Sequence, residues 1–215
     1  MNLRLPILDA CQYNMGMITV SIQAGGESRR MGQNKALMPF LGQPLIQRSV
    51  TRMRALSNDI IVITNQPASF VFLELPLFPD IRTGRGALGG LYTALYYATQ
   101  PLVVVIGCDM PFANPELLAH QAKLLENETA DAVIPLLPYG YEPLHAVYRR
   151  ATCLPAVEWA LDNDQWKLTS WFSKVKVQAL STEECLPFDP HGLAFANVNT
   201  PQELAEAELK GRSFE

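Results

Sequence analysis

Residues 19–35, TVSIQAGGESRRMGQNK, are the stretch that decides the fold of this chain. The stretch begins as a short run rich in β-branched residues and breaks at Gly25-Gly26. A strand that stops at two glycines leaves backbone N–H groups that can point at a ligand. Arg29, Arg30 and Lys35 give the following loop a positive charge. The stretch therefore predicts a strand that leads into an anion-binding loop, most simply a loop for a nucleoside triphosphate.

This loop differs from two well-known phosphate-binding signatures. A Walker loop would close with Gly-Lys followed by Ser or Thr, and no such closure follows the glycine pair. The G-x-G-x-x-G spacing of the dinucleotide-binding turn does not occur in the stretch either. The kind of nucleotide site must therefore be inferred from the rest of the chain.

Strands and helices alternate through the first two-thirds of the sequence. Continuous apolar runs predict buried parallel strands, and apolar residues at helical spacing predict amphipathic helices. The predicted strands are 59–64, 75–78, 102–106 and 130–136, and the predicted helices are 44–57, 66–73, 88–99 and 114–127. Repeated strand–helix units indicate an α/β protein: a Rossmann-like, three-layer α/β/α fold with a mostly parallel sheet and helices on both faces.

The last third of the sequence is less regular. It predicts a strand at 141–148, helices at 152–161 and 168–173, and strands at 174–180 and 195–199. Thr200-Pro201-Gln202-Glu203 is a capping box with proline at the first helical position, so a last helix begins there.

Length and composition limit the alternatives. A chain of 215 residues is long enough for one well-buried domain, which we place at 17–215, after an extension at 1–16 without clear periodicity. The net charge of −4 argues against general nucleic-acid binding. The apolar runs are shorter than the ~20 residues that span a membrane. The four cysteines include no C-x-x-C pair, which favours reduced thiols and a cytoplasmic protein.

The sequence resembles a known family at several motifs together. Residues 24–35, AGGESRRMGQNK, are similar to the signature loop of nucleotidyltransferases that act on small phosphorylated acceptors. With GQPL at 42–45 and NVNTP at 197–201, the set is most similar to molybdenum cofactor guanylyltransferases. Sugar-phosphate and cytidylyl relatives share versions of the loop, whereas the C-terminal motif makes the combination more specific. The likeness runs from about Ile18 to about Leu209.

Three positions depart from the family pattern. Gln23 stands where leucine is usual, Asn34 where aspartate is frequent, and Ala87 where proline is common. None of these departures removes a charged phosphate contact.

The resemblance implies a function, a cofactor and partners. It implies a nucleotidyltransferase fold and transfer of GMP from GTP to the phosphate of molybdenum-bearing molybdopterin, with release of pyrophosphate and Mg²⁺ as the cofactor. Cofactor biosynthesis proteins or recipient molybdoenzymes would be transient partners, and nucleic acid and membranes would not be partners.

The strongest candidate residues carry charge beside phosphate. Backbone groups of 23–26 (Gln23, Ala24, Gly25 and Gly26) would contact base and phosphate, although glycines there also suit a tight turn. Lys35 and Arg30 would neutralise the triphosphate and count as catalytic candidates. Asp109 follows the predicted strand 102–106, and Mg²⁺ binds one or two carboxylates plus substrate phosphates. The resemblance makes Asp109 the metal aspartate, and the structural alternative is a turn before Pro111.

Four further positions have weaker support. Asp80 follows a predicted strand and matches a nucleotide-binding position of the family, and its carboxylate can accept the N1–H and N2–H of guanine together. The structural alternative is a capping role in the fold. Asn65 follows the strand 59–64 and contacts nucleotide or forms a turn. Asn199 is the second candidate ligand for metal or acceptor, although the cap at 200–203 explains part of its motif. His145 lies in an apolar run, where a histidine is more often packed than catalytic.

Two other functions remain open from the sequence. One is a cytidylyltransferase or sugar-phosphate nucleotidyltransferase on the same scaffold. The motif NVNTP at 197–201 argues against the sugar-phosphate enzymes but does not argue against a cytidylyltransferase. The other is a non-catalytic nucleotide-binding adaptor, against which the joint presence of Lys35, Asp80 and Asp109 argues. No nucleophile–base pair stands out, which fits direct displacement at phosphorus.

Overall fold

A computed structural model gives the structure of the chain and describes residues 15–25, 34–127 and 129–213. Most of the predicted extension at 1–16 therefore lies outside the described residues, as do Gly26 and Arg30. The boundary predicted between extension and domain stays a prediction.

The centre of the described structure is an eight-stranded sheet in the order β10-β7-β9-β6-β1-β4-β5, with β8 paired to β7. Its strands are β1 (Ile18–Gln23), β4 (Ile60–Ile63), β5 (Leu77–Phe78), β6 (Leu102–Gly107), β7 (Ala132–Leu137), β8 (Gly140–Tyr141), β9 (His145–Arg149) and β10 (Val177–Ser181). Neighbours among β6, β1, β4 and β5 are parallel, and so are β7 and β10. The antiparallel pairs of this sheet all involve β8 or β9: β9 pairs with β6 and β7, and β8 pairs with β7. The prediction of a mostly parallel sheet is confirmed.

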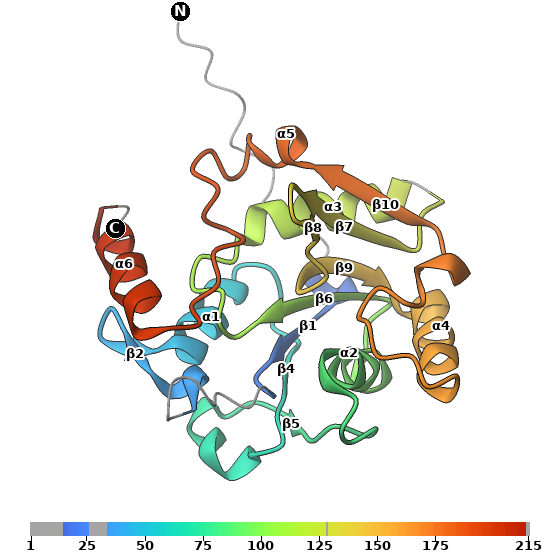
Figure 1. Cartoon of the computed structure of the whole chain (residues 1–215), viewed down its shortest axis with the longest axis horizontal. Helices are drawn as coiled ribbons and strands as arrows, with labels where there is room; N and C mark the ends of the chain where they lie inside the picture. Colours follow the sequence, from blue (N-terminus) through green and yellow to red (C-terminus); the bar gives the residue numbers. More distant parts are fainter. Residues whose placement is uncertain (1–14, 26–33, 128, 214–215) are drawn as a thin grey trace, which may run out of the picture.

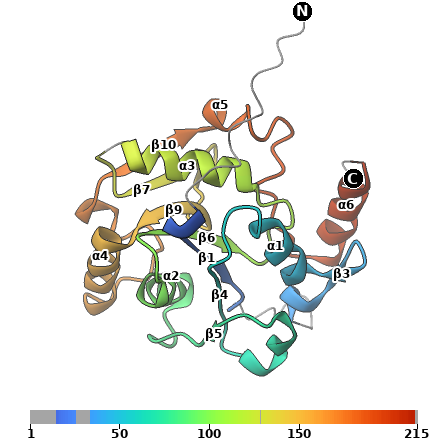
Figure 2. The same cartoon turned by 180° about the vertical axis from the view of Figure 1, so that it is seen from behind.

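Helices cover both faces of this sheet, as predicted (Figures 1 and 2). The α-helices are α1 (Leu45–Met53), α2 (Gly86–Tyr97), α3 (Pro115–Asn127), α4 (Arg150–Asp162), α5 (Thr182–Cys185) and α6 (Pro201–Arg212). Short 3-10 helices are η2 (Met15–Met17), η3 (Lys35–Leu37), η4 (Pro67–Ser69), η5 (Val71–Leu73) and η6 (Phe172–Lys174). A separate hairpin pairs β2 (Pro39–Phe40) with β3 (Gln43–Pro44).

Alternate residues of the central strands supply two cores. In β6, Val104 and Ile106 pack with α1 and α3, whereas Val103 and Val105 pack with α2 and α4. Successive side chains of a strand point to opposite faces of the sheet, so a continuous apolar run can bury both faces. The apolar runs of the sequence therefore become the middle layer of a three-layer structure.

The C-terminal helix α6 lies beside the β2–β3 hairpin, away from the centre of the sheet (Figures 1 and 2). Phe40, Phe112, Val198 and Ala207 form a small third core between them. The Thr200 hydroxyl accepts a hydrogen bond from Glu203 N, and the Glu203 carboxylate accepts one from Thr200 N. The predicted capping box is confirmed, and it determines where the chain turns into α6.

Three local predictions were wrong. Residues 195–199 form no strand. The segment is joined to the end of β6 by one backbone hydrogen bond, from Val198 N to Asp109 O at 2.9 Å, whereas a strand needs a series of such bonds. Residues 168–173 form turns that end in η6. The helix predicted at 66–73 is split into η4 and η5 at Phe70.

The carboxyl ends of β6, β1, β4 and β5 lie at one edge of the sheet, because these neighbours run parallel. The chain builds β4 and β5 on one side of β1 and then places β6 on the other side. Such a reversal of strand order opens a crevice at the carboxyl ends of the strands, where α/β proteins bind ligands. The crevice is therefore expected between the residues that follow β1 and those that follow β6.

Candidate nucleotidyl-transfer site

Three residues from distant parts of the chain meet at this edge. Lys35 Nζ donates a hydrogen bond to Asp109 Oδ2 at 2.6 Å and another to Asn199 Oδ1 at 2.8 Å. The side chains of Lys35 and Asp109 are only 14% and 25% exposed. The structure thus brings together the predicted triphosphate lysine, the predicted metal aspartate and the second candidate ligand.

The fold holds this cluster from both sides. Val198 N donates to Asp109 O at 2.9 Å, which joins the NVNTP segment to the end of β6. Glu203 Oε2 accepts from Asn199 N at 2.6 Å, so the capping box of α6 also positions Asn199. A Cβ added to Gly107 would collide with Asp109 Oδ1, so the present orientation of the aspartate lies directly over the bare backbone of Gly107. The cluster is built into the fold by neighbours on three elements.

The oxygen atoms of this cluster suit a magnesium ion. Carboxylate and amide oxygens are ligands that Mg²⁺ accepts, and it keeps other positions for water and substrate phosphates. Asp109 Oδ2 and Asn199 Oδ1 already share one cation, the Lys35 ammonium. Within the described residues no group of three or more His, Cys, Asp or Glu could hold a metal. An ion here would therefore depend on substrate oxygens as well.

A second group of polar residues lies at the carboxyl ends of β1, β4 and β5. Asn65 Nδ2 donates to Asp80 Oδ2 at 2.9 Å, and Asp80 N donates to Asn65 Oδ1 at 3.0 Å. Gln23 Nε2 donates to Ser21 Oγ at 3.1 Å and to Gly90 O at 3.4 Å. A Cβ added to Gly90 would collide with Gln23 Oε1 and lie 3.8 Å from Asp80 Oδ1. Gln23 and Asp80 therefore converge on the bare backbone of Gly90.

The Asp80 carboxyl is suited to accept hydrogen bonds from a ligand. Burial raises the pKa of Asp80 above its usual value, and the hydrogen bond from Asn65 opposes that rise. Asn65 engages Oδ2, while Oδ1 faces the side of Gly90. A partly buried carboxylate oriented by an asparagine can select a ligand that offers N–H donors.

The glycine loop is described only in part. Ala24 N donates to Ile63 O at 2.8 Å and Gln23 O accepts from Cys108 N at 3.0 Å, so the sheet already uses these two groups. Gly25 is exposed. Gly26 and Arg30 lie outside the described residues. Asn34 caps η3 by accepting from Ala36 N at 3.1 Å, which fixes the start of the helix that carries Lys35.

His145 and Cys108 are packed residues. His145 is fully buried, and its Nε2 accepts a hydrogen bond from Asn114 N at 3.0 Å. Burial lowers the pKa of His145 to about 4, so the ring is neutral at pH 7. Burial also raises the pKa of Cys108 to about 12, which leaves its thiol a poor nucleophile. Neither residue fits general-base or covalent catalysis.

Comparison with known proteins identifies the family. The model of the MobA-like NTP transferase domain matches residues 20–178. The chain belongs to the MobA-like NTP transferase family. A probable molybdenum cofactor guanylyltransferase from Carboxydothermus hydrogenoformans is 35% identical over 87% of this chain and 93% of that protein. A molybdenum cofactor guanylyltransferase from Desulfosudis oleivorans is 31% identical over 90% of this chain and 96% of its own length.

A solved structure supports the same membership in the MobA-like family. Molybdopterin-guanine dinucleotide biosynthesis protein A from Archaeoglobus fulgidus has a TM-score of 0.80 and 28% identity, covering 92% of this chain and all of that one. The predicted nucleotidyltransferase fold is confirmed, and the chain is a nucleotidyltransferase. Its described helices include none with the length and apolar composition that crossing a membrane requires.

We predict that Asp80 contributes to base selection in this MobA-like site. Asp80→Ala should weaken GTP binding and narrow the preference for GTP over ATP, because a site that pairs polar groups rejects ligands that leave them unpaired. Equilibrium dissociation constants for both nucleotides would measure the effect. Asp80→Asn keeps the side-chain shape and should show the same narrowing. Equal losses for GTP and ATP would instead give Asp80 a role in ribose binding or folding.

Proposed function

We propose that this chain transfers GMP from GTP to the phosphate of molybdenum-bearing molybdopterin and releases pyrophosphate. The product would be the guanine dinucleotide form of the cofactor. The observation that carries the proposal is the cluster of Lys35, Asp109 and Asn199 in a MobA-like chain. The relatives named as molybdenum cofactor guanylyltransferases support the choice of substrates.

The proposed reaction is a direct displacement at phosphorus. An oxygen of the acceptor phosphate forms a bond to the α-phosphorus of GTP, and the bond from that phosphorus to the bridging α–β oxygen breaks. The acceptor phosphate is already anionic, so no general base is needed. Lys35 would offset charge on the transferred group and on the leaving pyrophosphate, since catalysis here is mainly positioning and charge stabilisation. Arg30 is proposed to assist from the same loop.

We propose Mg²⁺ as the cofactor, held by Asp109 and with Asn199 as the second ligand. When bound, the ion would reduce the negative charge on the phosphates and polarise the reacting phosphoryl oxygen. Lys35 would then release Asp109 and bind phosphate oxygens instead. The pair of oxygens that now shares the ammonium supports this exchange.

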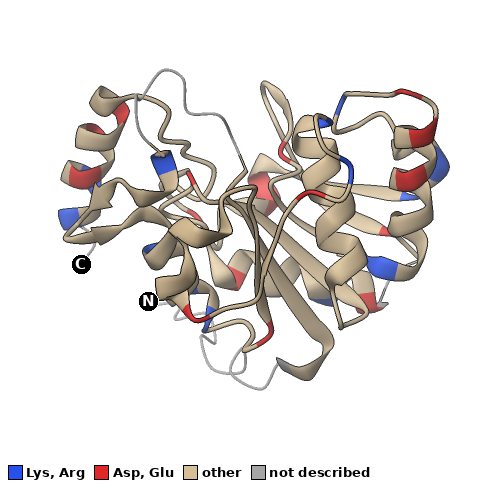
Figure 3. Cartoon of the chain, turned by 90° about the horizontal axis from the view of Figure 1, so that it is seen from below, with Lys and Arg blue, Asp and Glu red and all other residues tan. Residues whose placement is uncertain are grey.

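The remaining parts of the proposal concern the base, the partners and the location. Gln23, Asn65 and Asp80 would bind guanine, and the backbone at 24–26 would bind guanine or phosphate. Transient contact with cofactor biosynthesis proteins or recipient molybdoenzymes is proposed from the substrate, which must be handed on. Basic and acidic residues are interspersed over the described elements (Figure 3), which favours neither nucleic acid nor an anionic membrane as a partner. We place the protein in the cytoplasm on its cysteine pattern.

The experiment that tests this proposal is a pyrophosphate-release assay. The protein would be incubated with Mg²⁺, molybdenum-bearing molybdopterin, and each of GTP, CTP and ATP in turn. We expect pyrophosphate with GTP and formation of the guanine dinucleotide. Turnover with CTP alone would make the chain a cytidylyltransferase. Nucleotide binding without pyrophosphate from any pair would make it an adaptor.

A further inference from the structure

A carboxylate with no role assigned from the sequence lies close to the catalytic cluster. The antiparallel pairing of β6 and β9 sets Ile106 opposite His145, and Gly107 N donates to Leu144 O at 3.0 Å. Asp109 lies two residues after Gly107, and Glu142 lies two residues before Leu144. The ladder ends at this point, so Asp109 and Glu142 both lie in the short segments that leave β6 and enter β9 at the carboxyl edge of β6. The Asp109 charge adds to the effect of burial in raising the pKa of Glu142, which agrees with this proximity.

Glu142 has no cation to balance it among the described residues. Its Oε1 accepts one hydrogen bond, from Leu144 N at 3.3 Å, which supports the turn between β8 and β9. No ion pair with a described Lys, Arg or His is formed. A partly buried carboxylate without a counter-charge lowers stability unless hydrogen-bond donors compensate it. A ligand that offers N–H groups would supply this compensation.

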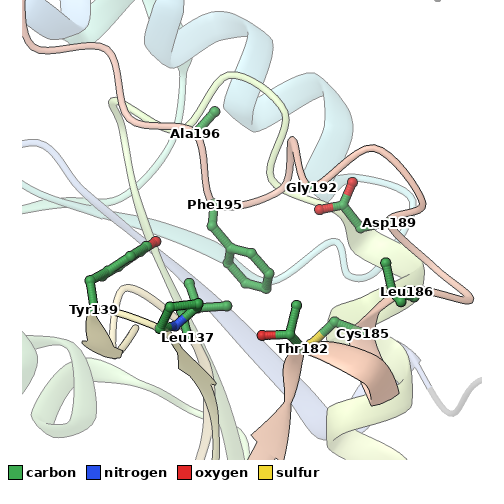
Figure 4. A pocket seen from close by; sticks show the side chains of 10 residues that line it. Leu137, Tyr139, Thr182, Cys185, Leu186, Asp189, Gly192, Phe195 and Ala196 are labelled. Atoms are coloured by element: carbon green, nitrogen blue, oxygen red, sulfur yellow. The ribbon is translucent and has the colours of Figure 1, made fainter.

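A pocket of about 310 Å³ lies beside the loop between β7 and β8, three residues before Glu142 in the chain. It is lined by Leu137 and Tyr139 at the end of β7, by Thr182 and Cys185 after β10, and by Phe195. Figure 4 shows the Phe195 ring between Tyr139 and Cys185. Because β7 and β10 run in the same direction as β6, the pocket opens at the edge that carries Asp109. Its volume is at the lower end of the roughly 300–1,000 Å³ of small-molecule sites.

Tyr139 and Glu142 link this pocket to the catalytic cluster. Tyr139 is 69% exposed, and two residues of β8 separate it from Glu142. Burial, and after it the Glu142 charge, raise the pKa of Tyr139 above its usual value. Asp109, Glu142, an exposed aromatic ring and a mainly apolar pocket thus lie at the same edge of the sheet.

We propose that Glu142 and the pocket bounded by Tyr139 and Phe195 bind the pterin ring system of the acceptor. The ring N–H and amino groups of a reduced pterin donate hydrogen bonds, which the carboxylate of Glu142 accepts, and its flat face packs on Tyr139. The acceptor phosphate then extends toward Asp109, where nucleotidyl transfer takes place. This inference rests on the proposed function, because it takes molybdopterin as the acceptor.

The test compares Glu142→Gln with the wild-type protein. The dissociation constant for metal-free molybdopterin, followed by pterin fluorescence, should rise about 10-fold to 100-fold, the range of a lost hydrogen bond to a charged group. The dissociation constants for GTP and for Mn²⁺, used in place of Mg²⁺, should not change. Glu206→Gln removes the same charge from an exposed position on α6 and should leave all three constants unchanged.

A second variant guards against a folding defect. Tyr139→Ala removes an exposed ring and should also raise the dissociation constant for molybdopterin without lowering the thermal unfolding midpoint. If Glu142→Gln lowers Mn²⁺ affinity and leaves molybdopterin binding unchanged, Glu142 is a metal ligand and the inference is overturned. If Glu142→Gln leaves the dissociation constants for molybdopterin, GTP and Mn²⁺ all unchanged, the inference is also overturned, and Glu142 acts only in the turn between β8 and β9. Wild-type protein that releases no pyrophosphate with GTP and molybdopterin would overturn the proposed function itself.

Discussion

Asp109→Asn should lower turnover by roughly 10²–10³, the loss typical of one strong electrostatic contact in the transition state. Asparagine has nearly the shape of aspartate but no charge, so the fold and the hydrogen bond from Lys35 can persist while Mg²⁺ binding weakens. Without metal, GTP affinity should stay the same or rise slightly, because a carboxylate close to phosphates repels them. Steady-state pyrophosphate release and GTP titrations with and without Mg²⁺ would measure both effects.

Glu206→Gln is the matched control for Asp109→Asn, because it removes one negative charge from an exposed position. It should leave turnover and metal affinity at the wild-type values. If Asp109→Asn keeps near-normal turnover at saturating Mg²⁺, the metal is held elsewhere, with Asn199 or Asp80 as the next residues to test.

Lys35→Met should lower turnover by a similar factor, roughly 10²–10³, while raising the affinity of the free protein for Mn²⁺. The turnover falls because a positive charge on the phosphates is lost. The metal affinity rises because the Lys35 ammonium now occupies Asp109 Oδ2 and Asn199 Oδ1, the two atoms proposed to hold the ion. Turnover is measured as pyrophosphate release, and Mn²⁺ binding by electron paramagnetic resonance without nucleotide.

Lys167→Met, at an exposed position, is the control for this pair of measurements and should change neither quantity. The opposite movement of turnover and metal affinity is the informative result. A fall in Mn²⁺ affinity in Lys35→Met would mean that the lysine supports the metal ligands, and the proposed exchange between ammonium and metal would be wrong.

Much of the fold could be predicted from local patterns in the sequence. The apolar runs at 59–64 and 102–106 became buried strands because a strand covered on both faces needs apolar residues at every position. The caps at Asn114 and Thr200 marked the true starts of α3 and α6, since capping depends on residues only two or three positions away. Residues 195–199 were mistaken for a strand because their extended backbone pairs at one point only, which no local pattern reveals.

The sequence by itself determined the class of fold, the family resemblance, and Lys35, Asp80, Asp109 and Asn199 as candidates, because their motifs are contiguous in the chain. Only the tertiary structure decided that Lys35 bridges Asp109 and Asn199, which lie 74 and 164 residues away from it. It also buried His145 and brought Glu142 to the same edge of the sheet as Asp109 through the antiparallel strand β9. The physical reason is that strand order and register, set by packing of the whole sheet, decide which distant side chains share one edge.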